Sequence, residues 1–312
     1  MTRYREMAKA ARRSMAKLTF KQQIEVLKIY EDVIWSLSKK ARNTREDTLT
    51  RRWLEDYREE IIKERLRLQR DIEKTVTGGM EQAAKIGTEF QISFWDEVEK
   101  YGIATTQTFK TMLSRVPLDA IQPILTGDLY VDDKSLSGRI WGYGNDFSSE
   151  IQYIINKGII EKKSAVELAE DLEQYVKPRA SRPTDWGNVY PNLKYKEVDY
   201  NAMRLARTSI MHAYQTSTLK GSDLNPFVEG IEWHSALDHR TCEICRERHG
   251  QIFDKDDVPL DHPNGACTLI PYIQKDTQEV ATEIREWLEG GTNPTLDEWY
   301  IRYGDLFADK TI

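Results

Sequence analysis

Cysteine is scarce in this 312-residue chain, which has three, and histidine is scarce too, with five. An odd cysteine count and the lack of an apolar N-terminal segment resembling a signal peptide argue against a disulfide framework and favour a reducing compartment. No apolar run approaches the roughly 18 residues that suggest a transmembrane helix. We therefore expect reduced thiols and no membrane segment.

Phosphate-binding motifs are also missing. Several glycines gather between residues 126 and 145, but this stretch has neither the GxxxxGK[ST] pattern nor a GxGxxG that follows a strand. Nucleotide binding is therefore not expected.

Charge is unevenly distributed along a chain whose net charge is −6. The first 75 residues hold 20 lysines and arginines and 13 acidic residues. Within residues 1–17 there are six basic residues, and Glu6 is the single acidic residue. DNA is one acidic partner that this basic region would suit, because neutralised phosphates supply affinity independent of base sequence. A solvated helix face is the alternative. The same choice applies to Arg204, Arg207 and His212, which suit phosphate but are more often the polar side of a helix.

Apolar residues recur at three- and four-residue steps over much of the chain, which is the spacing of amphipathic helices. Two long helices, capped by Thr19 and ended by Thr77-Gly78-Gly79, are expected to form an antiparallel hairpin. Prolines at 117 and 123 are expected to break the periodicity after a third helix. Further helices are predicted over residues 147–160, 164–176, 200–220, 278–289 and 295–306. The predicted fold is mainly α.

The polar chemistry of the chain is concentrated between Trp233 and Ile273, which holds every cysteine and four of the five histidines. Cys242 and Cys245 are separated by two residues and can face one ion from a tight turn. His262 and Cys267 return from a distant loop, so three thiolates and one imidazole are available for a closed tetrahedral zinc site.

Short strands are predicted at residues 251–253 and 268–270, which makes this segment a small β-containing module. Bound zinc would stabilise a module too small to hold itself together by its core. The alternatives to zinc are a reduced pair of buried thiols with His262 holding a turn, and a disulfide between Cys242 and Cys245. His234, His239 and His249 are interpreted as ordinary histidines.

The run WHSALDHRTCEICRERHGQIFDKDDVPLDHPNGACTLIPY resembles the signature of phage minor head proteins related to protein F of phage Mu. The residues that fall on the family pattern are Asp238, Arg240, Thr241, Cys242, Cys245, Gly250, Phe253, His262, Pro263, Asn264 and Cys267. Gly265 and Ala266 depart from it, where the family usually has Cys and Arg. One thiol is thereby lost, so His262 would have to serve as a ligand. With LARTSIMHAYQ and LYVDDKSLSGRIWGYGNDF upstream, the resemblance covers roughly residues 128–275.

The resemblance implies a minor structural protein of a phage head and no enzyme. Such a protein is expected to assemble with the portal and other capsid components, first in the host cytoplasm and then inside the head near the portal. It would also be expected to affect DNA packaging or ejection, with the basic N-terminal region contacting DNA or an acidic portal surface.

A metal-dependent nuclease of the His-Asn-His type is the alternative function. CEIC followed by LDHPNG resembles the zinc-flanked entry of such a site, whose chemistry needs a histidine that activates water and further residues that hold the catalytic metal. No histidine follows His262 and no cysteine follows Cys267, so the downstream half is missing.

Five parts are predicted from these patterns. They are a basic arm (1–17), a helical domain (18–125), a second helical domain (126–227) with a Pro/aromatic loop (177–198), the Cys/His module (228–275) and C-terminal helices (276–312).

Overall fold

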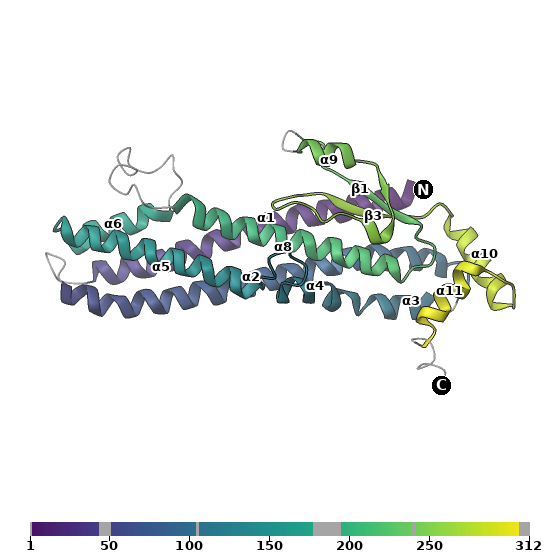
Figure 1. Ribbon diagram of the computed structural model, residues 1–312, viewed down its shortest axis with the longest axis horizontal. Coiled ribbons are helices and arrows are strands. Elements are labelled where there is room, and N and C mark those ends of the chain that lie inside the picture. The colour runs from purple at the N-terminus through teal and green to yellow at the C-terminus, as the bar shows by residue number, and fades with distance from the viewer. Residues whose placement is uncertain (1, 44–50, 104–105, 177–194, 239–240, 306–312) are drawn as a thin grey trace. The chain divides into compact units, whose positions relative to one another are not determined.

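The computed structural model describes residues 2–43, 51–103, 106–176, 195–238 and 241–305. The described chain is mainly α-helical and carries a small three-stranded sheet near the C-terminus (Figure 1), so the predicted fold class is confirmed. The helices are α1 (Thr2–Arg42), α2 (Arg51–Glu99), α3 (Thr106–Leu113), α4 (Val116–Thr126), α5 (Leu136–Ile160), α6 (Ala165–Val176), α8 (Tyr195–Asp223), α9 (Glu243–Arg248), α10 (Thr277–Leu288) and α11 (Pro294–Tyr303). The strands are β1 (Gly230–His234), β2 (Ile252–Phe253) and β3 (Thr268–Tyr272). None of the helices in these ranges combines the length and apolarity needed to cross a membrane.

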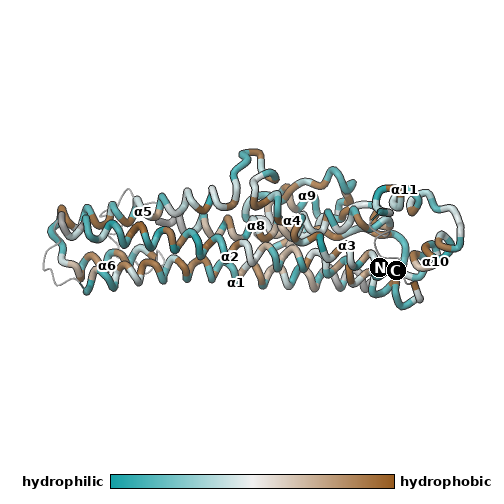
Figure 2. The backbone as a smooth tube through the Cα atoms, turned by 90° about the horizontal axis from the view of Figure 1, so that it is seen from below, coloured by the Kyte–Doolittle hydropathy of each residue, from teal (hydrophilic) through white to brown (hydrophobic). Residues whose placement is uncertain are grey.

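The two longest helices run past the ends that the sequence predicts for them. Thr19 lies inside α1, where its hydroxyl donates to the carbonyl oxygens of Met15 (3.0 Å) and Ala16 (3.1 Å), so it is not an N-cap. Gly78 and Gly79 lie inside α2 and do not end it. Figure 2 shows brown and teal alternating along α1 and α2, the pattern of an amphipathic helix.

The chain divides into two compact units, and neither is a continuous stretch of sequence. The first comprises Met1–Phe20, Gly78–Leu129 and Arg207–Ile312, and the second comprises Lys21–Thr77 and Tyr130–Ala206. Helices α1, α2 and α8 each contribute residues to both units. The five-part division given above follows the sequence and stays a prediction.

In the second unit, the later part of α1 and the early part of α2 pack as the predicted antiparallel hairpin. The hydroxyl of Ser36 donates to Glu64 at 2.7 Å, and that of Tyr57 donates to the carbonyl of Leu37 at 2.5 Å. Their core continues into α5 and α6 through two edge-to-face ring pairs. Phe147 lies 5.8 Å from the Tyr30 ring and 5.9 Å from the Tyr175 ring, centroid to centroid.

In the first unit, an aromatic core joins α2 and α3 to the C-terminal helices. Trp95 is fully buried and stacks on Phe109 with ring centroids 3.8 Å apart. Trp299 of α11 lies 4.8 Å from the same Phe109 ring and donates from Nε1 to the Leu224 carbonyl. The last helix is therefore docked within its own chain.

Side-chain hydrogen bonds to backbone N–H groups mark the N-termini of the shorter helices α6 and α11. The predicted capping box of α6 is confirmed, because the Ser164 hydroxyl accepts the Glu167 N–H and the Glu167 carboxylate accepts the Ser164 N–H. The predicted cap of α11 at Thr295 is wrong, since the Asn293 side chain accepts the Leu296 N–H. Pro123 lies inside α4 and does not break it.

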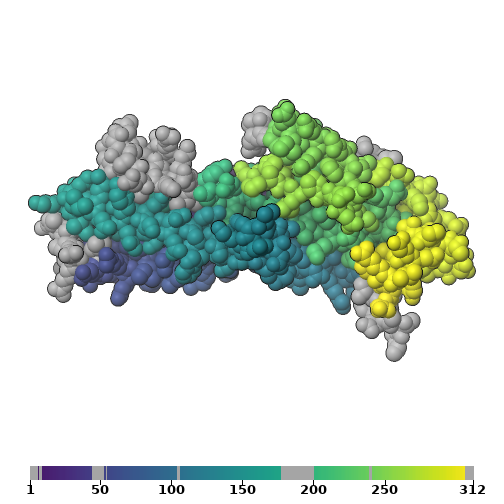
Figure 3. Space-filling model, in the orientation of Figure 1, coloured from purple at the N-terminus to yellow at the C-terminus, as the bar shows by residue number. Residues whose placement is uncertain are grey.

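The small sheet has the order β2-β1-β3, and both pairings are antiparallel. Strands β2 and β3 were predicted, and β1 was not. Trp233 of β1 pairs with Leu269 of β3, and both side chains are buried with Cys245 and Cys267 in one cluster. The described residues of the segment from β1 to β3 lie together in Figure 3, in light green.

Most of the predicted Pro/aromatic loop lies outside the described residues, and its last residues, 195–198, belong to α8.

Candidate metal centre

The first two predicted ligands lie at the start of α9. Cys242 is the N-cap of this helix, and its sulfur accepts the backbone N–H of Cys245 at 3.5 Å. The Cys242 side chain is exposed, whereas Cys245 is buried. The two-residue spacing places both thiols on one side of the turn, as the sequence predicts.

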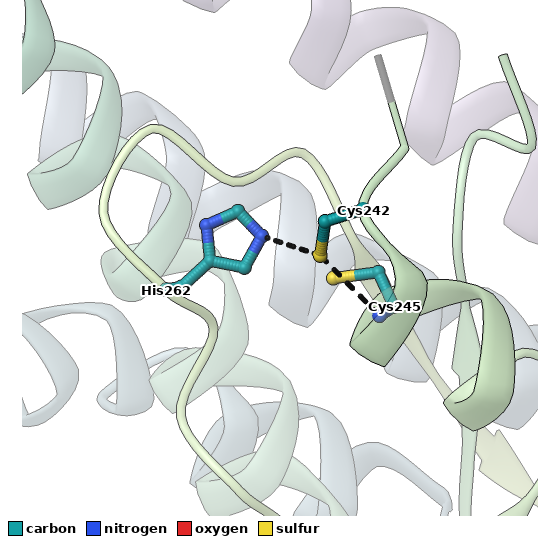
Figure 4. A group of neighbouring side chains, drawn as sticks. All are labelled: Cys242, Cys245 and His262. Atoms are coloured by element: carbon teal, nitrogen blue, oxygen red, sulfur yellow. Dashed lines mark hydrogen bonds between the residues drawn. The ribbon is translucent and has the colours of Figure 1, made fainter. Parts of the chain in front are cut away.

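His262 comes from the long loop between β2 and β3 and turns its ring toward these thiols (Figure 4). Its Nε2 lies 3.4 Å from the Cys242 sulfur. Its Nδ1 lies 3.0 Å from the carbonyl oxygen of Pro263, which accepts only, so in the neutral ring Nδ1 carries the proton and Nε2 presents a lone pair. A backbone carbonyl that orients a histidine in this way is typical of metal ligands.

Cys267 enters the site from its buried side. The donor atoms of Cys242, Cys245 and His262 lie within 4.8 Å of one another, and so do those of Cys245, Asp261 and Cys267. The four predicted ligands therefore fall into two overlapping groups that share Cys245. The sequence did not indicate Asp261, which is buried beside them.

The surroundings shift the pKa values of the three thiols in different directions. The N–H that Cys245 donates lowers the pKa of Cys242, and His262 beside it acts in the same direction. Burial raises the pKa of Cys245 and of Cys267. For His262, burial lowers the pKa, but the hydrogen bond to Pro263, the charge of Asp261 and the contact with Cys242 together raise the pKa overall. Metal binding would have to displace protons from the two inner thiols.

Helix α8 holds the loop that carries His262 and Cys267. Three buried polar side chains at positions i, i+4 and i+7 of this helix each contact loop backbone. Thr208 accepts the Asn264 N–H at 2.8 Å, and Gln215 donates to the Cys267 carbonyl at 2.9 Å. His212 Nε2 donates to the Asp261 carbonyl at 2.9 Å. The sequence places His212 on the polar side of its helix, and in the structure the ring is buried against this loop.

Among the described residues, the other two histidines of the module belong to neither group of possible metal donors. His234 and His249 form an edge-to-face pair with ring centroids 4.7 Å apart, and His249 Nδ1 accepts the Ser235 N–H. His239 lies outside the described residues.

The donors fit a soft or borderline cation such as zinc. Thiolate and imidazole are its usual ligands, and the imidazole here presents the correct nitrogen. All of this chemistry falls inside a stretch that also matches a known family, since residues 147–270 match the family described as Phage Mu protein F like protein. This stretch is similar to the phage Mu protein F-like family. The resemblance identified from the sequence is confirmed, and its matched range begins at Phe147 and includes all four predicted ligands.

A more distant relative carries an enzyme name. The chain is 23% identical over 249 residues to NAD(+)--arginine ADP-ribosyltransferase EFV of Enterococcus faecalis (strain ATCC 700802 / V583). The similar part covers 73% of this chain and 45% of that protein, so the chain spans less than half of its relative's length. No solved structure matches the chain.

Proposed function

We propose that this chain is a minor structural protein of a phage head that assembles with the portal during capsid morphogenesis. The observation that carries the proposal is the match to the phage Mu protein F-like family over residues 147–270. The mainly helical body supports it. The whole protein would enter the head during procapsid assembly and stay inside it near the portal.

The metal centre would serve this role as scaffolding. One zinc ion per chain, held by Cys242, Cys245, His262 and Cys267, would tie α9 to the loop before β3 and stabilise a module with a three-stranded sheet. Four protein ligands leave no position for a reactive water. Elemental analysis of protein purified without chelator should give near-stoichiometric zinc, and a fully folded protein without metal would contradict this part of the proposal.

Contact with packaged DNA would come from the basic face at the start of α1. Lys9, Arg13 and Lys17 are exposed at four-residue spacing, so their charges line one side of the helix. Like charges in this arrangement repel one another, and a polyanion would relieve the repulsion.

Co-expression with the cognate portal protein tests the assembly. A tagged portal should retain this chain through size-exclusion chromatography, while an unrelated portal of similar size serves as the control. Elution as separate species from both portals would contradict the proposal.

A His-Asn-His nuclease remains the alternative function. Cutting of plasmid DNA with Mg²⁺ or Mn²⁺ that disappears in His262→Ala would favour it over a structural role. The activity in the name of the enterococcal relative is checked separately, by incubating the chain with NAD and arginine-containing acceptors.

A further inference from the structure

Asp261 lies in the loop between β2 and β3, and both its backbone and its side chain form hydrogen bonds there. Its backbone carbonyl accepts from His212, and its N–H donates to the side chain of Gln215 at 3.4 Å. Its carboxylate accepts from the N–H of His262 at 2.9 Å and from the N–H of Cys267 at 3.1 Å, and it also accepts from the Cys245 thiol at 4.0 Å. The two oxygens therefore cross-link the backbone of two predicted metal ligands.

Gly265 lies inside the loop segment that this carboxylate closes. A Cβ atom on residue 265 would come closer than 3.0 Å to three atoms of the Asp261 carboxyl group. The backbone of Gly265 is not in the left-handed region, so its conformation does not require glycine. Glycine is needed at 265 because the Asp261 side chain occupies the space.

We propose that Asp261 is a positioning residue of the metal centre, whose carboxylate fills the place of a side chain at residue 265 and sets the spacing of His262 and Cys267. This inference rests on the proposed metal site. It also accounts for the departure of residue 265 from the family pattern, because a buried carboxylate at 261 and any side chain at 265 exclude one another.

A carboxylate suits this place better than an amide would. Two backbone N–H groups point at the side chain, and an ionised carboxylate offers an acceptor to each. Hydrogen bonds to a charged acceptor are also stronger than neutral ones. An asparagine would offer one acceptor and would turn an N–H₂ group toward the other N–H.

A double-mutant cycle in the full chain tests whether a carboxylate at residue 261 and a side chain at residue 265 exclude one another. Wild type, Asp261→Ala, Gly265→Ala and the double variant are compared for zinc affinity, measured by competition with a chromophoric chelator. Each single variant should lose affinity by about 10- to 100-fold, the usual effect of removing a group that orients a ligand. The double variant should bind no worse than Asp261→Ala, because the methyl group then meets no carboxylate. Losses that multiply in the double variant would overturn the proposal.

Two further variants separate positioning from general stability. Asp257→Ala removes an exposed carboxylate of the same module and should leave zinc affinity unchanged. Asp261→Asn keeps the size and one acceptor and should retain an affinity between those of wild type and Asp261→Ala. If Asp261→Asn and Asp261→Ala lower only the melting temperature and leave zinc affinity at the wild-type level, Asp261 is not a positioning residue.

The melting temperature of the metal-free proteins completes the test. The same non-additivity between residues 261 and 265 is expected without zinc, since the steric conflict does not involve the ion. A wild-type chain that binds no zinc would remove the proposed metal site, while the metal-free cycle would still decide whether the two residues exclude one another.

Discussion

At the scale of single residues, the three cysteines of the candidate site differ in exposure and in pKa. Cys242 is exposed and its pKa is lowered by the Cys245 N–H, whereas burial raises the pKa of Cys245 and Cys267. Reactivity of a thiol follows its thiolate fraction and its exposure. The three cysteines should therefore react in a fixed order.

Alkylation with iodoacetamide measures that order. In metal-free protein near neutral pH, Cys242 should be modified first and the two buried thiols much more slowly, as read by peptide mass spectrometry. Zinc should protect Cys242 because a bound thiolate is no longer available. Equal rates at all three positions, with or without zinc, would be incompatible with the site described.

His212 supplies a pH dependence whose sign can be stated. Burial lowers its pKa below the ordinary 6.5, so the unfolded chain takes up a proton at this residue before the folded chain does. The free energy of unfolding should therefore fall as pH drops below about 6.5 and should stop falling at the lower, folded-state pKa. Above that window the neutral ring keeps its bond to Asp261.

The His212→Gln variant isolates this contribution. The difference in unfolding free energy between wild type and variant, from denaturant titrations at several pH values, should shrink as pH falls below 6.5. A difference that stays constant from pH 7.5 to pH 5 would show that the buried imidazole does not titrate differently in the two states.

At the scale of elements, helical spacing predicted where helices lie but not where they end. Gly78 and Gly79 were expected to stop α2, since each glycine costs about 1 kcal/mol relative to alanine in a helix. Val76, Met80, Ala83 and Ala84 around them are fully buried, and this burial outweighs the cost. Neither the partner surface nor its packing can be read from the sequence of α2 alone.

The residues of the candidate site also differ in how far the sequence alone could identify them. Cys242 and Cys245 were predictable because two residues separate them, and His262 and Cys267 because soft ligands are rare in this chain. Asp261 was not, since it is one of several aspartates in its loop, and only the structure shows which of them is buried. The four-residue and three-residue steps from Thr208 to His212 to Gln215 were a signal that sequence reasoning missed.

A matched pair of glycines in α2 tests the packing of this helix on α8. A Cβ at Gly87 would lie 2.9 Å from the Tyr214 carbonyl oxygen, whereas nothing lies within 4 Å of a Cβ at Gly78. Gly87→Ala should destabilise the protein by about 1–3 kcal/mol, as overpacking usually does. Gly78→Ala should stabilise it by roughly 0.5–1 kcal/mol, and thermal unfolding of both variants would show whether the signs differ.

DNA binding by the basic face of α1 is better tested by substitution than by truncation, because truncation would also remove core residues. Ala11 and Met15 are buried in the same helix, so deletion of residues 1–17 would damage the fold. Replacing Lys9, Arg13 and Lys17 by glutamine should weaken DNA binding and reduce the slope of log affinity against log salt by roughly 0.9 for each phosphate that the variant no longer neutralises. Glutamine at the basic positions Lys28, Lys39 and Lys40 of the same helix is the control, and an unchanged slope in the first variant would exclude this face as the DNA-binding surface.

At the scale of the whole molecule, a helical body of two units carries one small module in which all three cysteines gather. The fold class could be predicted because the helical period extends over most of the chain. The division into units could not, because each unit is assembled from stretches that are distant in sequence. The similarity to the phage Mu protein F-like family extends over residues 147–270, which include all four predicted ligands.

Quantitative mass spectrometry of purified particles from the phage whose genome encodes this chain tests the central claim most directly. Empty procapsids and DNA-filled heads should both contain the chain in a small, fixed ratio to the portal protein, and washing at high salt should not remove it. Particles of both kinds that assemble normally without containing the chain would contradict a structural role in the head.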